Sequence, residues 1–261
     1  MIKTILNAAK TLLRRPVLFL PALLAVLIAI GLSIAFSPFL VDLAVNTIVL
    51  EIIPDSPLPA LPFHMLALYP TQIAAMLLLA ILTGMAFIAT TYWYAAYLAQ
   101  GERKRSFKKA CTDTISALKK IVLLIIFVLI IAGFFAVLAA VFTIIAGIIQ
   151  PLGFALIALL AIALIYLYIK LTFVVQALAI EECTVKEALQ KAWQFSTGRF
   201  WHIVLFIFII AATGQALLFI GDSLSEMALD EIIGLAAVSI FWMIATAYSG
   251  IAMAIYYLEK K

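Results

Sequence analysis

The sequence predicts an all-α polytopic membrane protein, a bundle of six transmembrane helices that form three hairpins. The composition is the first indication, because 67% of the 261 residues are hydrophobic and 11% are charged. Soluble domains are roughly 45–50% apolar and ~25% charged. The second indication is that several apolar runs reach the ~20 residues that a helix needs to cross ~30 Å of hydrocarbon. The third is that no run alternates with the period of two that barrel strands show.

The apolar runs cover residues 17–36, 73–97, 121–149, 154–180, 200–220 and 232–258. Lipid offers no hydrogen-bond partners to the backbone, so each run is expected to be a helix. The first run follows Lys10, Arg14 and Arg15, as the apolar core of a secretory signal does. This run is longer than the core of a removable signal, so we expect it to stay in the protein as the first span.

Charge predicts the orientation of the spans. The loops after spans two and four and both terminal segments carry the basic residues, whereas the three other loops contain no Lys or Arg. By the positive-inside rule, both termini face the cytoplasm of a multi-pass cell-membrane protein. We name one set of these residues the basic collar and expect it to contact anionic lipid headgroups or partner proteins. The basic collar consists of Arg14, Arg15, Arg103, Lys104, Arg105, Lys108, Lys109, Lys119, Lys120, Lys186, Lys191 and Arg199.

A short amphipathic helix is expected at 184–197, between spans four and five. Thr184 and Glu187 have the spacing of a capping box, and Gly198 suits a left-handed C-terminal cap. A helix of this length cannot span a bilayer, so it should lie in the headgroup plane with its apolar face toward lipid. That face comprises Val185, Ala188, Leu189, Ala192 and Trp193.

Two similar helices precede spans one and three, and they suggest an internal repeat. The first has apolar positions Ile2, Ile5, Leu6, Ala9 and Leu13, and the second begins after Ser106 with Phe107, Ala110, Cys111, Ile115 and Leu118. The chain is therefore interpreted as units 1–100, 101–181 and 182–261, each an in-plane cytoplasmic helix followed by a two-span hairpin. The matching starts SFKKA (106–110) and TVKEA (184–188) support common ancestry of the last two units.

The outer segment 37–70 is rich in proline and is expected to be stiff and extended. It could serve as an external contact or as a lid over the bundle. Residues 39–53 within it form either a short interfacial helix or an extension of span one.

Lys170 is the charged residue expected at membrane depth, and two interpretations stay open. Its long stem could snorkel to the cytoplasmic surface. Alternatively it could lie inside the bundle near Tyr166 and Gln176, and face an anionic headgroup or a counter-charge.

No enzymatic motif accompanies His64 or His202, and Cys111 and Cys183 have no partners at metal-ligand spacing. We therefore expect a non-enzymatic protein that needs no cofactor and no metal, with reduced thiols. The charge asymmetry is explained by a membrane surface, so no nucleic-acid partner is expected.

Residues 168–204, YIKLTFVVQALAIEECTVKEALQKAWQFSTGRFWHIV, resemble the signature of the glycerophosphoryl diester phosphodiesterase membrane-domain family. LLRRPVLFLPALL at 12–24 is similar to the N-terminal segment of its archaeal members. The positions of the family signature are occupied here by Glu181, Glu182, Ala188, Leu189, Ala192, Trp193, Gly198, Phe200 and Trp201. Relatives often have proline, and hence a kink, where this chain has Gln176. The resemblance implies a six-helix integral membrane protein without the separate catalytic barrel of fused members.

The leading hypothesis is thus a membrane protein whose basic collar contacts anionic lipid or partner proteins. The alternative is a permease subunit of a transporter driven by a separate ATPase, because six spans with inside termini also suit that class. A lipid-modifying enzyme built around Lys170 and Tyr166 is a third, less favoured possibility.

Overall fold

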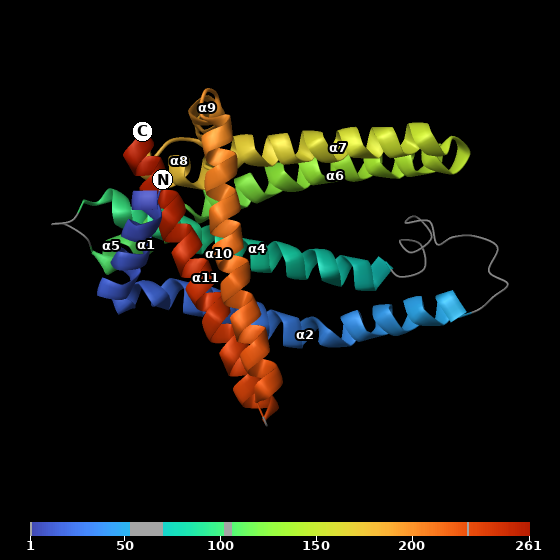
Figure 1. The fold of residues 1–261 in the computed structure, drawn as a ribbon, viewed down its shortest axis with the longest axis horizontal. Coiled ribbons are helices and arrows are strands. Elements are labelled where there is room, and N and C mark those ends of the chain that lie inside the picture. Colours follow the sequence, from blue (N-terminus) through green and yellow to red (C-terminus); the bar gives the residue numbers. More distant parts are fainter. Residues whose placement is uncertain (1, 53–69, 102–105, 229) are drawn as a thin grey trace. The chain divides into compact units, whose positions relative to one another are not determined.

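A computed structural model describes residues 2–52, 70–101, 106–228 and 230–261 (Figure 1). Every regular element among these residues is helical. Within the described residues, six helices are long and apolar enough to cross a membrane, so the prediction of an all-α polytopic membrane protein is confirmed.

The long helices are α2 (Phe19–Ile52), α4 (Pro70–Ala99), α6 (Leu118–Ile148), α7 (Gln150–Leu171), α10 (Phe200–Met227) and α11 (Glu231–Lys260). The short elements are α1 (Ile2–Arg14), the 3-10 turn η1 (Pro16–Leu18), α5 (Phe107–Ser116), α8 (Val174–Ile180) and α9 (Val185–Ser196). Helices α6 and α7 pack along each other, and so do α10 and α11. These two pairs are the second and third expected hairpins.

The chain divides into two compact units, one of residues Met1–Val26 with Phe87–Lys261 and one of residues Leu27–Ala86. In the first unit, the start of α2 and the end of α4 are held together by hydrogen bonds. The Tyr94 hydroxyl donates to the Leu18 carbonyl at 2.7 Å, and the Thr90 hydroxyl donates to the Pro21 carbonyl at 3.3 Å. The first and last turns of the first expected hairpin are therefore joined by hydrogen bonds.

In the second unit, α2 continues as a helix through Pro38 to Ile52. The extension of span one, and not a separate interfacial helix, is thus the interpretation that holds for residues up to Ile52. Proline has no N–H to donate to the carbonyl four residues earlier. The Ser37 hydroxyl instead donates to the carbonyl of Ile34 at 2.8 Å, which satisfies the acceptor that Pro38 leaves free. Residues 53–69 of the Pro-rich segment lie outside the described residues.

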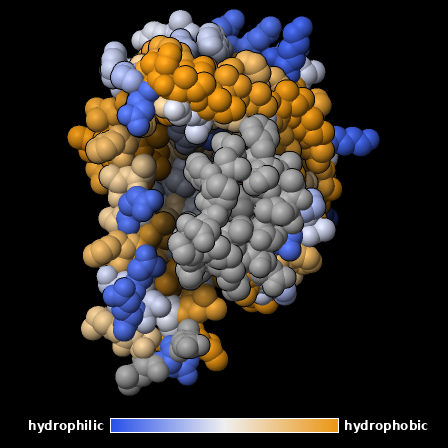
Figure 2. Space-filling model, turned by 90° about the vertical axis from the view of Figure 1, so that its right-hand side faces the viewer, coloured by the Kyte–Doolittle hydropathy of each residue, from blue (hydrophilic) through white to orange (hydrophobic). Residues whose placement is uncertain are grey.

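The buried core of the first unit lies where the short helices meet the ends of the long ones. Tyr94, Tyr257, Phe173 and Phe206 are among its largest fully buried side chains. A Cβ at Gly250 would lie 2.6 Å from Cδ2 of Tyr94, so glycine permits this close approach of α4 to α11. Away from the core, the long helices expose Leu, Ile and Phe, as lipid-facing helices do. Figure 2 shows broad hydrophobic areas on one face, interrupted by separate hydrophilic groups.

The fourth expected span, 154–180, lies within a candidate span over Gln150–Ile180, but this span contains an interruption that the sequence did not predict. Helix α7 ends at Leu171 and α8 begins at Val174, with the hydroxyl of Thr172 donating to the Tyr168 carbonyl at 2.7 Å. Phe173 lies at the break and is fully buried, with its ring stacked on Tyr256 at 5.6 Å. Packing of this ring explains the interruption, which occurs although position 176 is Gln and not Pro.

The three short helices α1, α5 and α9 begin and end close to where the sequence places them. The Ser106 hydroxyl caps α5, and Thr184 and Glu187 form the expected capping box of α9. Gly198 adopts φ +92°, the left-handed conformation expected after α9. The common ancestry of the units 1–100, 101–181 and 182–261 stays a prediction.

Candidate functional site

Helix α1 presents different chemistry on three sides. Its narrow inner face, which includes Thr4 and Ala8, is buried against α11, where the Thr4 hydroxyl donates to Glu259 Oε2 at 2.5 Å. The expected apolar side is open to the surroundings, since Ile2, Leu6 and Leu13 are 70%, 63% and 79% exposed. The basic side chains of Lys3, Lys10 and Arg14 are exposed as well.

Helix α5 shows a similar arrangement. Ala110 is fully buried against the protein, whereas Ile115 is exposed. Lys108 and Lys109 of α5 are exposed, and so is Lys119 at the start of α6. Both helices thus combine an exposed apolar side with exposed cations.

Helix α9 differs from the expectation that its apolar face lies toward lipid. Val185, Ala188 and Ala192 are buried, and α9 packs against α7 and α8. Of the expected face, Trp193 is exposed and Leu189 is half-buried. The reason is that small residues at helical spacing let other helices of the same chain approach closely.

Glu181 organises an ion-pair cluster that the sequence did not predict. Its carboxylate accepts from Lys191 Nζ at 2.6 Å and from the Tyr257 hydroxyl at 2.6 Å, and Lys261 Nζ lies at 3.5 Å. Burial acts to raise the Glu181 pKa, but the hydrogen bonds from Lys191 and Tyr257 outweigh it and hold the pKa below its usual value. The same hydrogen bond raises the pKa of Lys191. Lys191 of the basic collar is therefore paired with an acid of the same chain.

Other members of the basic collar also have partners within the chain. Arg15 Nη1 donates to the Tyr97 hydroxyl at 2.9 Å, and Lys120 Nζ donates to the Cys183 carbonyl at 3.1 Å. The guanidinium of Arg199 lies 5.1 Å from the ring centre of Phe195. Lys186 is exposed. Arg103, Lys104 and Arg105 lie outside the described residues.

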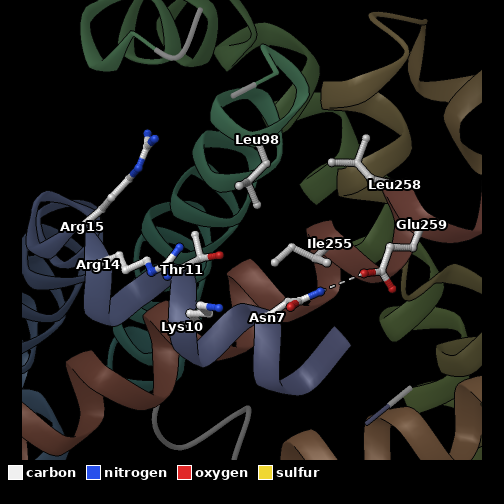
Figure 3. A pocket seen from close by; sticks show the side chains of 9 residues that line it. All are labelled: Asn7, Lys10, Thr11, Arg14, Arg15, Leu98, Ile255, Leu258 and Glu259. Atoms are coloured by element: carbon white, nitrogen blue, oxygen red, sulfur yellow. Dashed lines mark hydrogen bonds between the residues drawn. The ribbon is translucent and has the colours of Figure 1, made fainter. Parts of the chain in front are cut away.

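A hollow of about 580 Å³ opens between α1, the end of α4 and the end of α11, and we call it the α1 hollow. Its walls are Asn7, Lys10, Thr11, Arg14, Arg15, Leu98, Ile255, Leu258 and Glu259. Figure 3 shows the basic side chains on one side of the hollow and Glu259 on the other, with Leu98 and Ile255 between them. The Asn7 amide donates to Glu259 Oε1 at 3.5 Å.

A second hollow of about 360 Å³ has walls of mixed charge. Lys109 and Lys120 line it together with Asp113 and Glu182. The side-chain nitrogen of Gln100, which also lines this hollow, is buried without a hydrogen-bond partner among the described residues. Two members of the basic collar thus line one hollow together with two carboxylates.

Lys170 is buried, with an exposed fraction of 4%. Its Nζ donates to the Thr197 hydroxyl at 2.9 Å and lies 5.5 Å and 5.1 Å from the ring centres of Tyr166 and Trp193. The ammonium thus ends beside Thr197, in the turn between α9 and α10. The structure brings Lys170 and Tyr166 together, and the Tyr166 side chain is itself 44% exposed. Both interpretations of Lys170 stay predictions.

Gln176 lies on α8, after the break, and is almost fully buried. Its side-chain oxygen has no hydrogen-bond partner in the described part of the chain. Its side chain therefore leaves an unsatisfied acceptor in the core.

Comparison with protein-family models, with curated proteins and with solved structures finds no match. The resemblance to the phosphodiesterase membrane-domain family therefore stays a prediction. Within residues 2–52, 70–101, 106–228 and 230–261, no group of His, Cys, Asp and Glu is placed to hold a metal ion.

Several hydrogen-bond partners of the site residues were not predicted from the sequence. Glu259 and Glu181 are acids on the side of the molecule where the basic collar lies, and both accept bonds from other helices. Their position among cations was the available signal, because an acid in a basic region is often paired. Thr197 and Tyr97 gave no such signal, since their roles depend on which helices meet.

Proposed function

We propose that this integral membrane protein is non-enzymatic and that α1, α5 and the exposed part of its basic collar bind anionic lipid headgroups at the cytoplasmic surface. The observation that carries the proposal is α1, where exposed Ile2, Leu6 and Leu13 accompany exposed Lys10 and Arg14.

This combination suits the boundary between headgroups and acyl chains. An interfacial helix buries its apolar side about 5–10 Å into that boundary and leaves its cations among the headgroups. Each Lys or Arg near an anionic surface contributes about 1 kcal/mol, and the attraction weakens with salt. Because α1 also packs on α11, the contact would couple the lipid surface to the core of the protein.

The exposed cations Lys108, Lys109, Lys119 and Lys186 support the same role for α5, the start of α6 and the start of α9. Lys191 is left out of the proposed lipid contact because it is paired with Glu181. No described feature favours the alternative of a permease subunit driven by a separate ATPase, and that alternative stays a prediction.

The test measures quenching of tryptophan fluorescence in phosphatidylcholine nanodiscs that contain a minor fraction of brominated lipid. Trp201 and Trp193 are exposed and serve as native reporters. Brominated phosphatidylglycerol should quench more strongly than brominated phosphatidylcholine, and the excess should shrink as salt is added. Equal quenching by the two lipids at low salt would refute the proposal.

Matched variants assign the effect to the cations. Neutralising Lys108 and Lys109 as K108Q/K109Q should reduce the excess quenching by phosphatidylglycerol. The control D222N/E226Q changes the net charge by the same amount in the other direction, and it alters the last turns of α10, which the sequence places on the opposite side. This control should leave the lipid preference unchanged.

A further inference from the structure

We infer that the α1 hollow is a specific site for one lipid phosphate monoester, with the phosphate seated among Lys10, Arg14 and Arg15 and the lipid backbone on the apolar floor. This inference rests on the proposed function, because it takes the hollow to face the headgroup layer. It goes further by naming the site and the chemical class of headgroup.

The charges of the walls favour a doubly negative ligand. Lys10, Arg14 and Arg15 stand against the single carboxylate of Glu259, so the hollow carries an excess of positive charge. A phosphate monoester has a charge of about −1.5 to −2 at neutral pH. The diester of a common phospholipid carries a single negative charge and would leave part of this excess uncompensated.

The geometry of the basic wall favours phosphate over a dispersed negative surface. The hydrogen bond from Arg15 Nη1 to the Tyr97 hydroxyl, 2.9 Å long, fixes the orientation of the guanidinium. A guanidinium held in this way is prepared for paired hydrogen bonds to phosphate oxygens. The Thr11 hydroxyl lines the same hollow and adds a neutral hydrogen-bonding group.

The opposite part of the hollow suits the rest of a lipid. Glu259 is held by Thr4 and Asn7, which keeps its carboxylate on the wall away from the cations (Figure 3). Leu98, Ile255 and Leu258 form an apolar floor for the glycerol and the first acyl carbons. At about 580 Å³, the hollow lies within the range of ~300–1,000 Å³ that ligand pockets occupy and exceeds the need of a free phosphate ion.

The experiment uses native mass spectrometry of the full chain in detergent micelles that contain phosphatidate, phosphatidylglycerol or phosphatidylcholine. We expect one phosphatidate to be retained per protein, in preference to the other two lipids. K10Q/R14Q should weaken this adduct about 25-fold, because each basic residue changes the affinity for an anionic lipid roughly fivefold. The control K108Q/K109Q removes the same charge outside the hollow and should retain the single adduct.

Two further arms test the shape of the hollow and the need for acyl chains. Thr11→Trp narrows the hollow without a change of charge, so it should remove the phosphatidate adduct and keep the phosphatidylglycerol preference seen in nanodiscs. Soluble glycerol 3-phosphate offers the same phosphate group without acyl chains. It should bind far more weakly than phosphatidate, and equal binding would overturn the assignment to a lipid.

Failure of this inference is distinct from failure of the proposed function. If K10Q/R14Q and K108Q/K109Q weaken the adduct equally, or if Thr11→Trp retains it, the hollow is not the site, although the basic collar still binds anionic lipid. If the nanodiscs show no preference for anionic lipid, the proposed function itself is wrong.

Discussion

Proline at position 176 should be tolerated, although the residue lies within a segment apolar enough to span a membrane. In the interior of a helix, proline costs ~3 kcal/mol or more because it removes a hydrogen bond and its ring clashes with the preceding turn. Gln176 is the third residue of α8, where backbone N–H groups have no helical acceptor. The N–H of Ala177 is bonded, and it donates to the Phe173 carbonyl at 2.9 Å.

The neighbouring residue therefore provides a matched control. Gln176→Pro should differ from Gln176→Ala by less than about 1 kcal/mol, because both remove the side chain and proline adds only a ring in the first turn. Both variants also remove the side-chain oxygen of Gln176, which is buried without a partner among the described residues. Its removal should gain about 1–3 kcal/mol of stability, which offsets part of the loss of packing. Ala177→Pro breaks the bond to Phe173 and should cost ~3 kcal/mol against the wild type.

Thermal unfolding in detergent, followed with a thiol-reactive dye, measures the difference. Cys183 is buried and its thiol contacts the Ala177 carbonyl at 3.6 Å, so the reaction of this thiol with the dye follows the unfolding of the junction, whereas the half-buried Cys111 contributes a signal common to all variants. Ala177→Pro should lower the melting temperature by roughly 6–12 °C, whereas Gln176→Pro should match Gln176→Ala. An equally large loss for both prolines would show that the helix runs unbroken through residues 172–173 and would refute the reasoning.

Three other predictions use the same unfolding assay. The Glu181 pKa is lowered, so the stabilisation from this carboxylate is present above the usual pKa of 4.5 and is lost as the pH falls through the lowered value. Glu181→Gln should remove this acid-side dependence, and a variant that keeps it would contradict the role of the cluster. Lys170→Met keeps the stem near Tyr166 and Trp193, so its free energy of unfolding should stay within about 1–2 kcal/mol of the wild type. Lys170→Ala should be less stable than this because it leaves a cavity. Equal losses for both variants would mean that the ammonium and not the stem matters. Gly198→Ala should cost about 1 kcal/mol because of its positive φ alone, since a Cβ there meets no described atom within 4 Å, and a neutral result would place the turn in another conformation.

The sequence predicted the ends of helices well where these ends depend on bonds within the same helix. The capping box of Thr184 and Glu187 and the left-handed Gly198 depend on local bonds, and both occur as expected. The break at Thr172–Phe173 was missed because nothing in the local sequence disfavours a helix there. It depends on the burial of the Phe173 ring against Tyr256, a residue of another helix.

The sequence predicted which basic residues belong to the candidate site, but it did not predict the partners to which they bond. The positions of Lys191 and Arg15 on the basic side follow from charge distribution, whereas their bonds to Glu181 and Tyr97 depend on how distant segments meet. The same limit applies to α9. Val185, Ala188 and Ala192 of its expected apolar face are buried, but periodicity alone does not distinguish a face that lies on lipid from one that lies on α7 and α8.

The contact between α1 and α11 also sets an order of events during synthesis. Thr4 and Asn7 precede the six candidate spans of the described residues in the sequence, whereas their partner Glu259 lies at the end of the sixth. The α1 hollow consequently cannot form before α11 has been made, so occupancy by a lipid there would report that the spans between its walls have assembled.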